Sequence, residues 1–65
     1  MSQTRALAER IYALAEKLDR EPSTLSRKLL GSGVRLAEIA NGSTMTMDVF
    51  HRVEREVAQL ESEAA

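Results

Sequence analysis

The first third of the chain carries apolar residues at the spacing of one helical face. Between residues 4 and 18 the apolar positions follow steps of four, three, one and three residues: Leu7, Ile11, Leu14, Ala15 and Leu18. A stripe of this kind has the 3.6-residue period of an amphipathic helix. The pattern predicts a helix over residues 4–18 that buries this face against the rest of the chain.

Two shorter helices are predicted in the middle of the chain, over residues 22–30 and 34–41. Pro22 suits the first turn of the former, and Asn41-Gly42 is typical of the end of the latter. Between them, Gly31-Ser32-Gly33 predicts a tight turn, in which Ser32 can cap the following helix. The apolar positions of the two helices are Leu25, Leu29, Leu36 and Ile39.

Each of these short helices has one apolar face, so both faces can be buried only if the helices cross against a shared core. Two helices that meet at a steep angle across a short turn containing glycine form a helix-turn-helix unit. The second helix of such a unit commonly enters the major groove of DNA. Nucleic-acid recognition is therefore the leading functional hypothesis.

A fourth helix is predicted after a loop at residues 43–45, with Thr46 as its cap and Asp48 in its first turn. Its apolar positions have the heptad-like spacing of three, four and three residues: Phe50, Val53, Val57 and Leu60. This stripe either faces the domain core or meets the same helix of a second copy, through its outer half near Val57 and Leu60. All four residues are predicted as a dimer interface on the second interpretation.

The four helices together predict an all-α domain with a central helix-turn-helix. The chain has 65 residues and no cysteine, which leaves room for one domain, over residues 4–62, and excludes disulfides and thiolate metal sites. Residues 1–3 and 63–65 are predicted to be disordered. A core of this size rarely supplies more than about 3–5 kcal/mol, so a homodimer is expected. No apolar run approaches the length of a membrane span, and a cytoplasmic location is expected.

Charge is distributed unevenly along the chain, although the net charge is only −1. The segment from Arg20 to Arg35 contains four basic residues and one acid, a balance of +3, and it coincides with the predicted helix-turn-helix. From Asp48 onward five acids face two arginines, a balance of −3. Because salt screens charge beyond roughly 8 Å, a local basic patch favours phosphate binding more than the net charge opposes it.

The residues from Leu7 to Gly42 resemble the lambda-repressor/Cro-like helix-turn-helix family. Leu25, Ser26 and Leu29 match the apolar, small and apolar positions of the family's second helix, and the resemblance covers roughly 50 of the 65 residues. It implies a lambda-repressor-like arrangement of four helices in which the third reads DNA. The chain departs from the pattern in that third helix, which carries fewer polar DNA ligands than most members have.

A second register is similar to the lac-repressor-type helix-turn-helix and runs from Leu14 to Arg27. In this register Ala15 is the small packing residue and residues 22–30 form the reading helix. Asp19 then stands where the turn glycine is usual. Under the first register the exposed residues of helix 22–30 bind phosphates, and under the second they contact bases. Both registers remain open.

In the first register the start of the third helix approaches base edges through Gly33, Val34, Arg35 and Glu38. Arginine pairs with guanine, valine contacts the thymine methyl, and a carboxylate accepts from the cytosine amine. Glu38 has the alternative of an ion pair with Arg35. The expected phosphate contacts are Ser23, Thr24, Arg27 and Lys28, with Ser32 and Thr44 as weaker candidates.

No catalytic motif, cofactor site or metal site is expected, because His51 is the sole histidine and no serine has a base positioned by a motif. His51 is predicted to lie at the surface. The predicted function is a homodimeric transcriptional repressor that binds palindromic double-stranded DNA at a bacterial or phage nucleoid. The alternatives are a protein-binding adapter, such as an antiactivator or antitoxin, and an architectural or excision factor.

Overall fold

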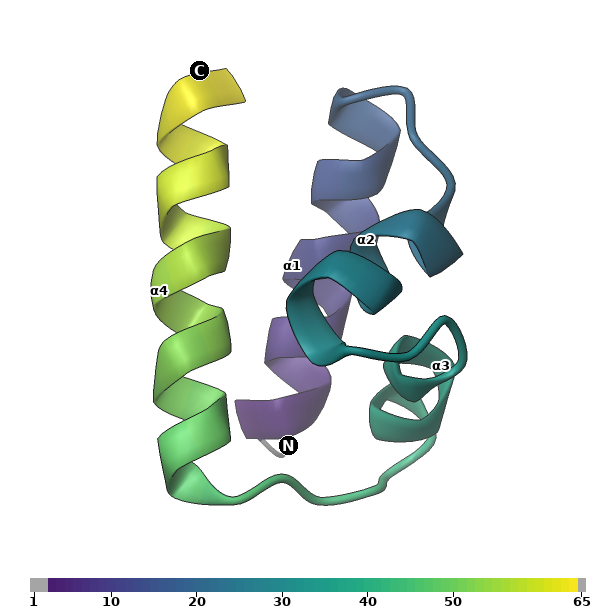
Figure 1. The fold of residues 1–65 in the computed structure, drawn as a ribbon, viewed down its shortest axis with the longest axis vertical. Helices are drawn as coiled ribbons and strands as arrows, with labels where there is room; N and C mark the ends of the chain where they lie inside the picture. Colours follow the sequence, from purple (N-terminus) through teal and green to yellow (C-terminus); the bar gives the residue numbers. More distant parts are fainter. Residues whose placement is uncertain (1–2, 65) are drawn as a thin grey trace.

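A computed structural model describes residues 3–64 of the chain. It contains four helices: α1 (Gln3–Lys17), α2 (Pro22–Leu30), α3 (Arg35–Ala40) and α4 (Met47–Ala64). In Figure 1, α4 extends along one side of the molecule, α3 lies on the opposite side, and α2 crosses in front of α1. Helix α1 contacts the other three, and α2 also contacts α3 and α4. The predicted all-α fold with four helices is confirmed.

The core is aliphatic and draws on all four helices. Ile11, Ile39, Val53 and Val57 are completely buried. The remaining buried apolar side chains are Leu7, Ala8, Leu14, Ala15, Leu25, Leu29, Leu36 and Phe50. The apolar stripes predicted for all four helices therefore converge on one shared core.

Three of the four residues predicted at a dimer interface belong to this core. Phe50, Val53 and Val57 are buried against α1 and its neighbours within the same chain, and Leu60 is partly buried against them. A side chain without exposed surface offers nothing to a second copy, so the interface prediction is wrong at these three positions. The stripe is the core-facing side of α4.

The ends of the helices follow local rules. Helix α1 ends in a Schellman motif, in which the Arg20 N–H donates to the Ala15 carbonyl at 2.9 Å and Asp19 takes a φ of 55°. Helix α2 has Pro22 at its first position and ends at Gly31, whose φ is 82°. Asn41 and Gly42 end α3, confirming the predicted stop.

Helix α4 begins where the sequence predicts it. The Val49 N–H donates to Oγ1 of Thr46 at 3.3 Å, which confirms the predicted cap, and Asp48 lies in the first turn. At the other end α4 continues through Glu63 and Ala64, and α1 begins at Gln3. These three residues were expected in disordered ends and are helical instead. Residues 1, 2 and 65, the remainder of that prediction, lie outside the described residues.

An ion-pair cluster ties α1 to the distal half of α4. Arg10 Nη2 contacts Glu61 Oε1 at 2.7 Å, Nε contacts Oε2 at 3.3 Å, and Nη1 lies 3.8 Å from Glu54 Oε2. The hydrogen bond from Arg10, reinforced by its charge, lowers the pKa of Glu61 from its ordinary value. Within residues 3–64, none of the helices combines the length and apolar character that a bilayer crossing requires.

Candidate nucleic-acid interface

A buried serine fixes the geometry of the α2–turn–α3 unit. Ser26 is fully buried, and its hydroxyl donates to the Ser32 carbonyl in the turn. The same oxygen accepts from the Leu36 N–H at the start of α3, at 2.9 Å. One side chain of α2 therefore bonds both the turn and the next helix. This matters at the start of α3, since that helix has no side-chain cap of its own. This clamp sets how α3 leaves the turn.

The turn itself spans residues 31–34, and α3 begins at Arg35, one residue later than predicted. The expected capping of α3 by Ser32 takes a looser form, since its Oγ accepts from the Val34 N–H at 3.4 Å. Gly33 lies close under α2. A Cβ on it would lie 3.6 Å from Nη2 of Arg27 and 3.8 Å from the Ser23 carbonyl. The turn and the outer side of α2 therefore form one continuous surface.

We call this the α2–turn surface and define it by Ser23, Thr24, Arg27, Gly33 and Val34. Its three α2 residues are exposed, on the side of the helix opposite the buried Leu25, Ser26 and Leu29. With the other residues between 3 and 64, Arg27 forms no ion pair, so its guanidinium is available to an anion. Val34 follows Gly33 in the turn and is 65 % exposed, which adds an apolar side chain to this surface.

The side chain of Arg35 extends toward the segment before α4 and is not directed outward from α3. Its Nη2 donates to the Thr44 carbonyl at 2.7 Å, and its Nη1 lies 3.5 Å from Glu38 Oε1. The alternative predicted for Glu38, an ion pair with Arg35, is therefore present. The outward side of α3 consists of Ala37 and Glu38, both exposed. Direct pairing of Arg35 with guanine would require it to leave both partners.

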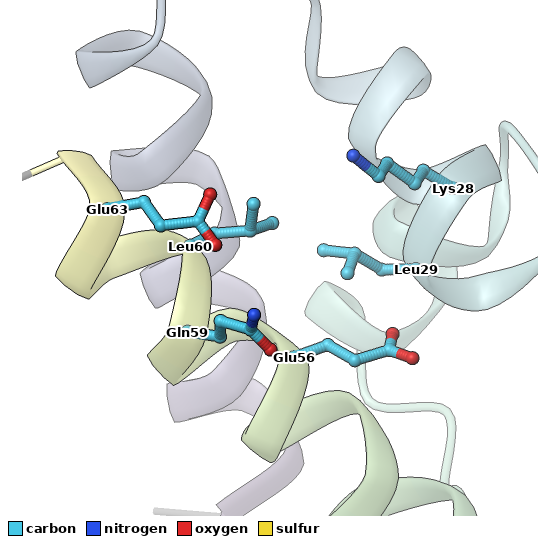
Figure 2. A pocket seen from close by; sticks show the side chains of 6 residues that line it. All are labelled: Lys28, Leu29, Glu56, Gln59, Leu60 and Glu63. Atoms are coloured by element: carbon cyan, nitrogen blue, oxygen red, sulfur yellow. The ribbon is translucent and has the colours of Figure 1, made fainter.

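Lys28 lies apart from the other predicted phosphate ligands. It lines a groove between α2 and α4 with Glu56 and Glu63, as Figure 2 shows. In that view Lys28 extends from α2 toward α4, and the two glutamates extend from α4 toward α2. The carboxylates lower the local positive potential, so Lys28 is a weaker phosphate ligand than its sequence position suggests.

The structure thus brings together some of the ten predicted DNA-binding residues and separates others. It gathers Ser23, Thr24, Arg27, Gly33 and Val34 on one surface, and Ser32 is half-buried in the same turn. Arg35, Glu38 and Thr44 form a separate hydrogen-bonded group beside α3, with the Thr44 side chain exposed. Sequence reasoning missed the Thr44 carbonyl as a partner of Arg35, because no side-chain pattern signals a backbone acceptor nine residues away.

His51 is exposed, as predicted, and packs edge-on against the Phe50 ring with centroids 5.8 Å apart. The described residues contain no cluster of three or more His, Cys, Asp or Glu side chains suited to a metal ion. Comparisons with protein-family models, curated proteins and solved structures find no significant match to this chain. The candidate interface therefore has to be judged on its own geometry.

Proposed function

We propose that this chain binds double-stranded DNA through the α2–turn surface and acts as a small transcriptional regulator. The observation that carries the proposal is the α2–turn–α3 unit, joined by the hydrogen bonds of Ser26, with Ser23, Thr24 and Arg27 exposed on its outer side. Hydroxyl and guanidinium groups on a helix are donors to phosphate oxygens and to base edges. The resemblance to the lambda-repressor/Cro-like family supports the same role.

Within this proposal α2 supplies the main donor, and α3 contributes less. Arg35, the strongest ligand predicted on α3, is occupied by the Thr44 carbonyl and Glu38. Arg27 is exposed and has no such partner among residues 3–64. Val34 adds a side chain suited to a thymine methyl group. Both registers recognised in the sequence place Ser23, Thr24 and Arg27 against DNA, so the proposal does not depend on choosing between them.

Occlusion is the simplest mode of regulation for a domain of this kind. A domain bound within a promoter blocks the polymerase by its presence, without any further activity. Two domains on half-sites one helical turn apart would bind a palindrome. Single modules of this size bury a small interface with DNA, and pairing raises the affinity into the range of specific regulators.

The experiment is selection from random duplexes, followed by binding of the enriched sequence at two salt concentrations. We expect an enriched motif and a steep salt dependence. Arg27→Ala should weaken binding and reduce the salt slope by about one unit if Arg27 holds a phosphate. If it instead contacts a base, the variant should lose about 1–3 kcal/mol on the selected site and relax one position.

Arg55→Ala is the matched control, because it removes the same charge from an exposed position on α4. It should leave both the affinity and the slope close to those of the unmodified protein. Equal effects of the two variants would show that Arg27 contributes only through its charge and not through a specific contact with DNA. Loss of a base preference in Arg35→Ala, with none in Arg27→Ala, would move base reading to α3. No enrichment at low ionic strength would refute DNA binding altogether.

A protein-binding adapter is the second candidate, and the outer side of α3 favours it. On that side Ala37 has no side-chain donor for a phosphate and Glu38 repels one, and the exposed Val34 precedes them in the chain. Failure of the DNA selection, with the fold intact by circular dichroism, would make this candidate the better one. An architectural or excision factor would use the same surface as a regulator, and measurable bending of the selected duplex would identify it.

A further inference from the structure

The outer side of α3 combines apolar groups with a single carboxylate. Val34, Ala37 and Glu38 follow steps of three and one residue and are all exposed, Val34 at 65 %. Leu36 and Ile39 are buried on the opposite side of the same helix. None of the three exposed side chains carries a donor group, so this side suits neither phosphate oxygens nor the acceptor edge of guanine.

These three side chains lie on one helical turn. Val34 has helical dihedral angles, with φ −101° and ψ −9°, and its carbonyl accepts from the Glu38 N–H at 3.2 Å. Residues three and four positions apart on a helix are neighbours on its surface, so Val34 adjoins both Ala37 and Glu38. The Ser43 N–H donates to the Glu38 carbonyl at 3.0 Å, which also fixes the backbone at the end of this turn.

The carboxylate of Glu38 is anchored and still open to a ligand. Arg35 Nη1 lies 3.5 Å from its Oε1, while Nη2 of the same guanidinium donates to the Thr44 carbonyl at 2.7 Å. The Glu38 side chain remains 53 % exposed, so its oxygens can accept further hydrogen bonds. The adjoining guanidinium offsets part of the repulsion between this carboxylate and the phosphates of DNA.

We propose that this side of α3 reads 5-methylcytosine in the major groove. Cytosine presents its N4 amine there as a donor, and a methyl group on C5 lies beside that amine on the same edge of the base. Glu38 accepts from the amine, and Val34 and Ala37 contact the methyl group. The inference rests on the proposed DNA binding and adds the chemistry of the base that α3 selects.

The four unmodified bases each satisfy at most part of this surface. Cytosine offers the amine but leaves Val34 and Ala37 without an apolar partner. Thymine has the methyl group, but its O4 is an acceptor and repels the Glu38 carboxylate. Adenine has an acceptor beside its amine and no methyl group, and guanine presents two acceptors. A cytosine with a C5 methyl group satisfies the carboxylate and the apolar side chains together.

The test is a selection from two random duplex libraries, one unmodified and one amplified with 5-methyl-dCTP in place of dCTP. The methylated library should yield a motif with a cytosine at a fixed position. Removal of the methyl group from that cytosine should weaken binding about fourfold, the effect of one buried methyl group. A T·A pair at the same position should weaken binding by roughly five- to hundredfold, the range for one wrong base pair.

Two variants test whether these side chains carry the preference. Val34→Ser replaces the exposed apolar group by a hydroxyl, so the ratio of affinities for methylated and unmethylated duplex should fall close to one. Glu38→Gln gives the side chain a donor as well as an acceptor, so the discrimination against thymine should narrow. Met47→Ser is the matched control, because it removes an exposed apolar side chain from α4 and should keep both ratios. General damage to the fold would lower the affinity for all duplexes equally and leave the ratios unchanged.

The outcomes separate this inference from the proposed function. No enrichment from either library would refute DNA binding, and base reading by α3 with it. Enrichment of one motif from both libraries, bound equally well with and without the methyl group, would overturn the reading of 5-methylcytosine and leave DNA binding intact. A methyl preference that persists in Val34→Ser, or a T·A pair bound as tightly as the methylated cytosine, would also overturn it.

Discussion

Replacement of Ser26 by alanine should destabilise the protein well beyond the loss of one surface hydroxyl. The side chain is fully buried, and its oxygen joins the Ser32 carbonyl to the Leu36 N–H. In the variant the Leu36 N–H remains buried without its partner. The Ser32 carbonyl loses a donor but lies in the half-buried turn, where it also accepts from the Arg35 N–H at 3.4 Å and can be reached by water.

The magnitude follows from these two groups. A buried donor left without a partner costs about 1–3 kcal/mol, and the carbonyl near solvent costs much less. Alanine recovers about 0.5 kcal/mol through its higher helix propensity. The expected net loss is about 1–2.5 kcal/mol. In a domain of this size each kcal/mol corresponds to roughly 4–8 °C in Tm, so the shift should be about 4–20 °C.

Urea unfolding followed by circular dichroism at 222 nm measures this loss as a change in midpoint at constant slope. Ser23→Ala is the matched control, because it removes an exposed hydroxyl from the same helix and should change stability by less than about 0.5 kcal/mol. If the free energies of unfolding of the two variants differ by less than about 0.5 kcal/mol, the hydrogen bonds of Ser26 contribute nothing to stability. The α2–α3 geometry would then depend on the aliphatic core alone.

Two further predictions concern contacts away from the clamp. Glu61→Gln should cost about 0.5–1 kcal/mol at pH 7, discounted for the exposure of its ion pair with Arg10. Because that contact lowers the pKa of Glu61, the stabilisation is present above the ordinary glutamate pKa and is lost as pH falls through the lowered value. Urea midpoints of variant and parent should therefore converge as the pH falls below the lowered pKa, and a gap that does not narrow as the solution is acidified would contradict this assignment. Asp19→Gly should raise stability by about 0.5–1 kcal/mol, since the φ of 55° at this position suits glycine better than aspartate; a lower Tm than the parent would show that the Asp19 side chain has a stabilising role.

Much of the secondary structure could be predicted from neighbours in the sequence. Pro22 marks the start of α2, Gly42 the end of α3 and Thr46 the start of α4, because each acts on backbone groups within one helical turn. The apolar stripes likewise reported which face of each helix is buried. The same local rules failed at the chain ends, where Glu63 and Ala64 extend α4 without any change of pattern.

The candidate interface was only partly predictable. The exposed hydroxyls of Ser23 and Thr24 and the guanidinium of Arg27 follow from their positions opposite the apolar face of α2. The surroundings of Lys28 and the partners of Arg35 do not follow. The approach of α4 to α2 decides the former, and the path of the segment before α4 decides the latter. Both bring together residues nine or more positions apart, which no helical periodicity encodes.

The sequence by itself determined that there are four helices, where most of them begin and end, and which side of each is apolar. Tertiary structure alone decided what covers those sides. The stripe of Phe50, Val53 and Val57 had two consistent interpretations, and only the packing against α1 made it core. It also decided that Arg10 meets Glu61, 51 residues away. The physical reason is that helix formation depends on groups within four residues, whereas the partner of a side chain depends on how whole helices cross.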